Sequence, residues 1–217
     1  SISGTTQIGR LLPLFSQHRG GAKLAKVTLS NTCLNQDDLK LLADLPRLLS
    51  IKLQHVECTP SILTFSVEKF TTLKHLAVEG SNLTEITFEY GAVSELEKIV
   101  LTSTNIGSIR RSWNLVKLDE VELDKSSSRL VPSFDAHKLT LRGALLEQGD
   151  LETMANCRNM RSLVLKSCGI SQNKITFKKD GFPKLNLLAV DCPTVTDIVF
   201  TGGSAPKLEK IIWSSPT

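Results

Sequence analysis

Short alternations of apolar and polar residues recur along this chain at a nearly constant spacing. The stretch from Leu73 to Leu83 reads LKHLAVEGSNL, with apolar residues at offsets 0, 3, 5 and 10. The alternating part predicts a short strand with two inward side chains, and the last leucine predicts a turn that folds beneath it. Similar segments follow anchor residues at Leu24, Leu48, Leu73, Leu96, Leu118, Ala136, Met160, Leu185 and Leu208.

The spacing of these anchors indicates a repeat architecture. Consecutive anchors are 22 to 25 residues apart, except for one step of 18 between Leu118 and Ala136. This period is typical of leucine-rich repeats, which run to roughly 20–29 residues. We therefore predict an α/β fold, a leucine-rich-repeat solenoid with a curved parallel β-sheet on its concave face and short helices and extended segments on its convex face. The predicted inward pairs are Val27/Leu29, Ile51/Leu53, Leu76/Val78, Ile99/Leu101, Val121/Leu123, Leu139/Leu141, Leu163/Leu165, Leu188/Val190 and Ile211/Trp213.

A longer duplication is superimposed on the repeats. Residues 73–99 and 185–211 are identical at 12 of 27 positions, including the run LEKI at the end of each. The sequence therefore predicts a partial N-terminal repeat or cap over 1–23 and a domain of about nine repeats over 24–217, in which 24–101 is related to 136–213. Residues 105–135 are the least regular, and we expect a bend or a thin repeat there rather than a domain boundary.

The segments between the predicted strands are of two kinds. Asn35 is a favourable N-cap, and the two aspartates after it suit the positive end of a helix, so 34–42 is predicted to be a short helix, with 147–154 as its duplicate. Alternating β-branched and aromatic residues predict extended chain at four other places, which are 63–65, 86–88, 175–177 and 198–200.

Composition and charge narrow the class of protein. Hydrophobic residues make up 41% and charged residues 22% of the chain, which is ordinary for a folded protein. The net charge of +4 is spread along the sequence, so no nucleic-acid partner is predicted. Five cysteines without a C-x-x-C spacing indicate neither a disulfide framework nor a zinc site, and we expect reduced thiols. No apolar run is long enough for a membrane span, and we expect a monomer.

Motifs for catalysis or cofactor binding are lacking in the sequence. It contains neither a phosphate-binding G-x-x-x-x-G-K-[ST] loop nor a G-x-S-x-G nucleophile elbow. His55 and His75 are predicted to come near each other on adjacent strands, but no cysteine nucleophile or acidic ligand accompanies them. We therefore predict no catalytic residue, no metal and no cofactor, and expect that the protein is not an enzyme.

A row of three carboxylates is the most distinctive feature of the predicted outward face. Glu120, Glu122 and Asp124 alternate with inward residues, Lys98 lies one repeat before them, and Lys138 and Arg142 lie one repeat after. These charges can pair laterally across strands about 4.8 Å apart. Two interpretations remain open: a solvated, self-neutralising face, or an acidic ridge that selects a partner by charge.

The predicted partner-binding residues extend beyond this row. Trp113 is a residue type enriched at contact hot spots, although it is equally compatible with a core position. The full predicted set on the concave face is Lys98, Glu120, Glu122, Asp124, Lys138, Arg142, Lys166, His55, His75 and Trp113.

The amino-acid sequences of the repeats resemble those of a known family. The segments 24–32 (LAKVTLSNT), 34–39 (LNQDDL), 77–86 (AVEGSNLTEI) and 96–99 (LEKI) are similar to the C-terminal repeats of plant intracellular immune receptors. These are the coiled-coil, nucleotide-binding, leucine-rich-repeat (NLR) disease resistance proteins. The repeat sequences are most similar to those of the grass proteins. The resemblance covers about residues 8–213.

The resemblance implies a binding function in plant defence and innate immunity. Such domains recognise a pathogen effector or a guarded host protein, and they help to keep the nucleotide-binding module inactive, in the cytoplasm and in some cases the nucleus. The alternative is the substrate-recruiting domain of an F-box ubiquitin ligase, which would require an F-box-like helical segment upstream. A receptor ectodomain would normally show L-x-G-x-I-P repeats and paired capping cysteines, neither of which occurs here.

Overall fold

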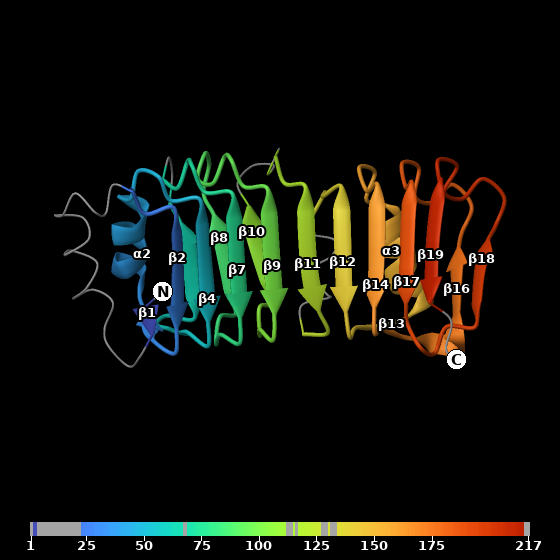
Figure 1. Ribbon diagram of the computed structural model, residues 1–217, viewed down its shortest axis with the longest axis horizontal. Coiled ribbons are helices and arrows are strands. Elements are labelled where there is room, and N and C mark those ends of the chain that lie inside the picture. Colours follow the sequence, from blue (N-terminus) through green and yellow to red (C-terminus); the bar gives the residue numbers. More distant parts are fainter. Residues whose placement is uncertain are drawn as a thin grey trace. The chain divides into compact units, whose positions relative to one another are not determined.

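The computed structural model describes residues 2–3, 23–66, 69–111, 115, 117–126, 130 and 134–214 of the chain. It is an α/β structure in which parallel strands dominate and helices are few (Figure 1). The chain divides into two compact units, Ser1–Leu118 (unit 1) and Asp119–Thr217 (unit 2), so each is described by itself. Most of the predicted N-terminal cap over 1–23 lies outside the described residues. None of the helices in the described ranges has the length and apolar character needed to cross a membrane.

Unit 1 contains a main sheet whose neighbouring strands pair in parallel. Its strands follow one another in the order β1 (Ile2–Ser3), β2 (Lys26–Ser30), β4 (Ser50–Gln54), β7 (His75–Glu79) and β9 (Lys98–Thr102). The second and fourth residues of the last four strands are buried, and the residues on either side of them are partly or fully exposed. The predicted inward aliphatics are aligned in register: Val27, Ile51, Leu76 and Ile99.

Unit 2 has a main sheet of the same kind. The strands are β11 (Glu120–Asp124), β12 (Lys138–Arg142), β14 (Ser162–Lys166), β17 (Leu187–Asp191) and β19 (Lys210–Ser214), in that order. The residues predicted to point inward are likewise aligned: Val121, Leu139, Leu163, Leu188 and Ile211. The first four are buried, whereas Ile211 and Trp213 of β19 are exposed, unlike the prediction. The predicted parallel strands, one in each repeat, are thus confirmed within both units.

A second layer covers the inward side of each main sheet. In unit 1 it is formed by β3 (Cys33–Leu34), α2 (Gln36–Ala43), β5 (Glu57–Cys58), β6 (Ile62–Phe65), β8 (Glu85–Phe88) and β10 (Ser108–Arg111). In unit 2 it is formed by β13 (Leu145–Leu146), α3 (Gln148–Ala155), β15 (Gly169–Ile170), the 3-10 turn η4 (Ser171–Asn173), β16 (Lys174–Phe177) and β18 (Asp197–Phe200). Figure 1 shows β8 and β10 behind the β7–β9 part of the unit 1 sheet.

Both helices form where the sequence predicts them. Asn35 is the N-cap of α2: its side chain accepts a hydrogen bond from the Asp38 backbone at 2.9 Å, and the Asp38 carboxylate accepts one from the Asn35 backbone at 3.1 Å. This reciprocal capping box satisfies two helix-terminal N–H groups that would otherwise lack partners. The next residue, Gln36, holds both backbone groups of Thr64, so the helix is fixed to β6.

Phenylalanines fill the space between the layers. In unit 1 the Phe65 ring lies 5.1 Å from Phe70 and 5.2 Å from Phe88. In unit 2 the equivalent Phe177 ring lies 5.0 Å from Phe182 and 4.8 Å from Phe200. Aromatic pairs at these separations add stability beyond the burial of their area.

The boundaries of the elements repeat with an offset of 112 residues. Adding 112 to both ends of β2, α2, β4, β6, β7, β8 and β9 gives β12, α3, β14, β16, β17, β18 and β19. The left-handed backbone conformations repeat as well, at Asn31 and Gly143 and at Phe70 and Phe182. Equivalent positions in the two units can therefore be compared directly.

Candidate binding surface

Six of the predicted residues lie on the outward face of the unit 2 sheet, which we term the charged surface: Glu120, Glu122, Asp124, Lys138, Arg142 and Lys166. The strands β11 and β12 pair so that Glu120 lies opposite Lys138 and Asp124 lies opposite Arg142. Lys138 Nζ is 2.9 Å from Glu120 Oε1, and the Arg142 guanidinium donates to the Glu122 carboxylate. The predicted lateral pairing across β11 and β12 is therefore confirmed.

The third carboxylate of the row is held differently. The backbone N–H and the hydroxyl of Ser126 both donate to Asp124 Oδ1, at 3.0 and 2.6 Å. On the other side of β12, Lys166 lies opposite Arg142 and next to Asp191 of β17. The resulting face presents fixed carboxylates on β11 and cations on β12 and β14.

One residue of this face departs from the alternation of inward and outward side chains that the sequence predicts. Thr140 lies between the inward residues Leu139 and Leu141 on β12, where the alternation predicts an outward side chain, but it is buried. Lys98 belongs to unit 1 and Glu120 to unit 2, so the predicted pairing between them stays a prediction. Trp113 lies outside the described residues.

Unit 1 presents a polar ladder on its outward face, which the repeat pattern alone did not predict. Gln54 Nε2 donates to Glu79 Oε2 at 2.9 Å, and Ser30 Oγ donates to Gln54 Oε1 at 3.4 Å. Lys52 Nζ is 3.5 Å from Glu79 Oε2. The Gln54 hydrogen bond, with help from the charge of Lys52, holds the pKa of Glu79 below its ordinary value. The only signal in the sequence was the repeat spacing of 25 residues between Gln54 and Glu79.

The predicted approach of His55 and His75 is wrong. His75 begins β7 and lies opposite Ser50, whereas His55 follows the last residue of β4. The two side chains are therefore separated by the length of a strand, roughly 16 Å at about 3.3 Å per residue. Within the described ranges, no group of three or more His, Cys, Asp or Glu side chains is arranged to hold a metal ion.

His55 instead borders a small hollow at the carboxyl ends of β2 and β4. The hollow has a volume of about 290 Å³ and is lined by Asn31, Thr32, Cys33, His55 and Glu57. Cys33 is exposed there, whereas Cys58 on the neighbouring strand is buried, and all five cysteines of the chain are free thiols. Burial, with a contribution from the nearby Cys33, raises the pKa of Cys58 to about 12.

This contrast predicts a difference in thiol reactivity. At pH 8, we expect Cys33 to react with a thiol-specific disulfide reagent in the folded protein, whereas Cys58 stays protonated and unreacted until the protein unfolds, because only the thiolate attacks. Mass spectrometry of the labelled peptides measures both sites. Equal labelling rates for the two thiols in the folded state would contradict this expectation, and a Cys33→Ser variant provides the control for assignment.

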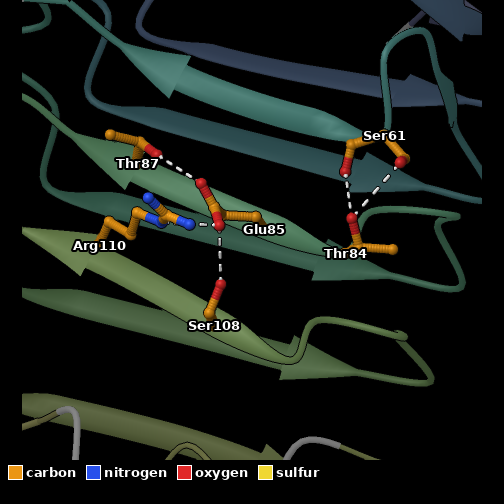
Figure 2. Close-up of polar contacts among 6 residues, drawn as sticks. All are labelled: Ser61, Thr84, Glu85, Thr87, Ser108 and Arg110. Atoms are coloured by element: carbon orange, nitrogen blue, oxygen red, sulfur yellow. Dashed lines mark hydrogen bonds and ion pairs between the residues drawn. The ribbon is translucent and has the colours of Figure 1, made fainter.

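A cluster of polar side chains around one carboxylate, Glu85, lies on the second layer of unit 1 (Figure 2). Glu85 of β8 accepts hydrogen bonds from the Ser108 hydroxyl and from Arg110 Nε of β10, both at 2.9 Å, and from Thr87 at 3.2 Å. The hydrogen bond from Ser108, followed by the charge of Arg110, lowers the pKa of Glu85. This cluster ties β10 to β8, and sequence reasoning missed it because no extended segment was predicted at Ser108–Arg111, within the irregular stretch 105–135.

Comparison with known proteins does not identify the chain. No protein-family model matches it, and no curated protein matches it. Indications of function therefore come from the geometry of the two outward faces and of the strand edges.

Proposed function

We propose that this chain is a leucine-rich-repeat solenoid that serves as a non-catalytic protein-binding domain of a plant intracellular immune receptor. In this proposal the outward face of the main sheets recognises a pathogen effector or a guarded host protein, and contributes to autoinhibition of a nucleotide-binding module. The protein acts in the cytoplasm. The similarity of the repeats to those of grass receptors suggests the family.

The charged surface of unit 2 is the observation that supports a binding role most directly. Its carboxylates and cations come from neighbouring strands in fixed register, and ion pairs hold Glu120 and Glu122 in place. A surface whose side chains are ordered before binding loses less conformational entropy in a complex. Its alternating charges favour a partner with the complementary pattern and disfavour others.

The proposal is tested with defined proteins. We would measure, by biolayer interferometry, the binding of a panel of purified effectors from grass pathogens and of a purified nucleotide-binding module from a grass receptor of this family. Binding by at least one of them is expected. The triple variant Glu120→Lys, Glu122→Lys and Asp124→Lys should weaken that binding by about tenfold or more, because like charges then face one another across the interface.

A second triple variant with the same change in net charge shows whether a loss of affinity is specific to the charged surface or follows from net charge alone. Asp37, Glu57 and Glu209 are exposed carboxylates outside the charged surface, so their replacement by lysine should leave affinity nearly unchanged. Circular dichroism verifies that both triple variants are folded. No binding by any effector or by the module would overturn the proposed function, and equal losses in the two triple variants would remove the charged surface from it.

A further inference from the structure

Two of the free thiols of unit 2 come directly after neighbouring strands of the main sheet. Cys168 is the second residue after β14, and Cys192 is the first residue after β17. The last residues of these strands, Lys166 and Asp191, lie opposite each other, and the Ser167 N–H continues the pairing by donating to the Asp191 carbonyl at 2.6 Å. The register therefore puts Cys192 opposite Ser167, one residue from Cys168.

The side chains of both cysteines are buried and lie within reach of each other. Cys168 is 1% exposed and Cys192 is 0% exposed, and a hydrogen bond joins the two thiols. The Cys168 sulfur also lies 3.5 Å from the carbonyl oxygens of Leu141 and Lys166. Thiols that already touch need only rotation about their side-chain bonds to form a disulfide. We term this pair the unit 2 dithiol.

The duplication shows that the fold does not require thiols at these positions. The residues of unit 1 that correspond to Cys168 and Cys192 are Val56 and Gly80. Val56 is 0% exposed, so an aliphatic side chain fills the first position without loss of burial. The unit 2 dithiol is therefore a feature of one copy of the duplicated block and not of the repeat itself.

Unit 1 has a cysteine pair of its own, which is arranged differently. Cys33 and Cys58 lie on the paired strands β3 and β5, but Cys33 is exposed and Cys58 is buried. Their side chains thus lie on opposite faces of this small sheet, where a disulfide cannot join them without movement of the backbone. This pair provides an internal control for the unit 2 dithiol.

The two thiols of the unit 2 dithiol are chemically unequal. The hydrogen bond from Cys192, assisted by backbone N–H groups such as that of Ala144, holds the pKa of Cys168 below its ordinary value although burial acts in the opposite direction. The same hydrogen bond, together with burial, raises the pKa of Cys192. Because the thiolate is the nucleophile, Cys168 is the attacking residue of the pair and Cys192 the one that attacks second.

We propose that the unit 2 dithiol is an oxidation site, at which a small hydroperoxide such as hydrogen peroxide converts Cys168 and Cys192 into a disulfide between neighbouring repeats. The Cys168 thiolate attacks one peroxide oxygen, the O–O bond breaks, and a sulfenic acid forms while the released hydroxide takes up a proton to become water. The Cys192 sulfur then attacks Cys168 Sγ, the S–O bond breaks, and hydroxide leaves with the Cys192 proton as a second water. Two thiols are oxidised and one peroxide is reduced, and an added dithiol reverses the reaction by exchange.

The disulfide would act on the part of the outward face nearest to it. It joins the chain just beyond Lys166 and Asp191, so the carboxyl ends of β14 and β17 are then fixed to each other covalently. A cross-link of this kind stabilises a fold mainly by restricting the unfolded chain. The oxidation site does not depend on the binding function proposed above.

Oxidation of the reduced protein by hydrogen peroxide tests the proposal. We would treat the protein near neutral pH, block the remaining thiols with iodoacetamide in urea, isolate the monomer and digest it with trypsin without reduction. Mass spectrometry should find peptide 167–174, which contains Cys168, joined to peptide 185–207, which contains Cys192. Dithiothreitol should separate them, and the oxidised protein should unfold at a temperature several degrees higher than the reduced protein.

Single variants assign the order of attack. In Cys192→Ser the reaction should stop at the Cys168 sulfenic acid, which dimedone traps, whereas in Cys168→Ser the thiol of Cys192 should remain unmodified. Labelling by dimedone should differ by about fivefold or more between the two variants, each first verified as folded by circular dichroism. In the control variant Cys58→Ser, the joined peptide should form as in the unmodified protein.

Three results would overturn the proposal. The first is the absence of the joined peptide under conditions that oxidise the exposed Cys33. The second is joining of Cys168 to Cys157 as often as to Cys192, since the geometry of the pair would then have no influence. The third is equal labelling by dimedone in Cys192→Ser and Cys168→Ser, which would contradict the assigned order of attack.

Discussion

Replacing Phe88 with alanine is expected to lower the free energy of unfolding by about 3–5 kcal/mol, the usual range for a buried phenylalanine. The ring is 0% exposed and lies 5.2 Å from Phe65, between β8 and the main sheet of unit 1. Its removal leaves a cavity that the hydrogen-bonded strands β6, β8 and β10 cannot collapse to fill. Urea denaturation followed by circular dichroism measures the loss.

The duplicate provides a matched control for this prediction. Phe200 occupies the equivalent position and stacks on Phe177 at 4.8 Å, but it is 37% exposed. Phe200→Ala should therefore cost only about 1–2 kcal/mol, since less apolar area is buried and solvent can enter the space. Losses of similar size in the two variants would mean that the edge of unit 2 is covered in solution, which contradicts the exposure of Phe200.

Replacing Gly80 with valine is expected to lower the free energy of unfolding by roughly 2–3 kcal/mol. Gly80 follows β7 with a φ of +62°, a left-handed conformation that a β-branched residue adopts only with strain. A Cβ atom built there would also lie 2.3 Å from Nδ1 of His55, so the imidazole ring must move. Thermal and urea denaturation both report the change.

Two further variants separate backbone strain from contact with the ring. Gly143 has a φ of +61° and no heavy atom within 4 Å of a built Cβ, so Gly143→Val should show the strain alone, about 1–2 kcal/mol. Adding His55→Ala to Gly80→Val should recover the remaining loss. If Gly80→Val and Gly143→Val have the same effect, the approach of His55 has no energetic consequence.

The fold was largely predictable because repeat spacing and inward burial depend on local sequence. The inward pairs, the Asn35 cap and the extended segments at Phe65 and Phe88 all follow from patterns of a few residues. Ile211 and Trp213 fit the same pattern but are half exposed within the part of the chain that the structure describes. A periodic sequence specifies which side chains point inward, and the adjacent repeat determines whether they are shielded.

The candidate sites were less predictable because they depend on register between strands. Glu120 and Lys138 could be placed together, and likewise Asp124 and Arg142, since main-sheet residues at equal offsets in consecutive repeats lie opposite each other. His55 and His75 were misplaced because they occupy different offsets, one after its strand and one at the start of its strand. The Glu85 cluster was missed because it requires β10, and the sequence pattern did not predict an extended segment at Ser108–Arg111.

Most paired main-sheet strands are separated by a similar number of residues, and this has a consequence for how such a chain can change in length. Neighbouring main-sheet strands are joined by residues about one period apart, as in Leu76 and Ile99, so each pairing closes a loop of similar size and similar entropic cost. Deletion of one complete repeat would join equivalent positions of neighbouring repeats and keep the inward aliphatic side chains aligned. Removal of a single residue within a strand would turn the following aliphatic side chains toward water. We therefore expect natural variants of this domain to differ by whole periods, or by insertions confined to the connections.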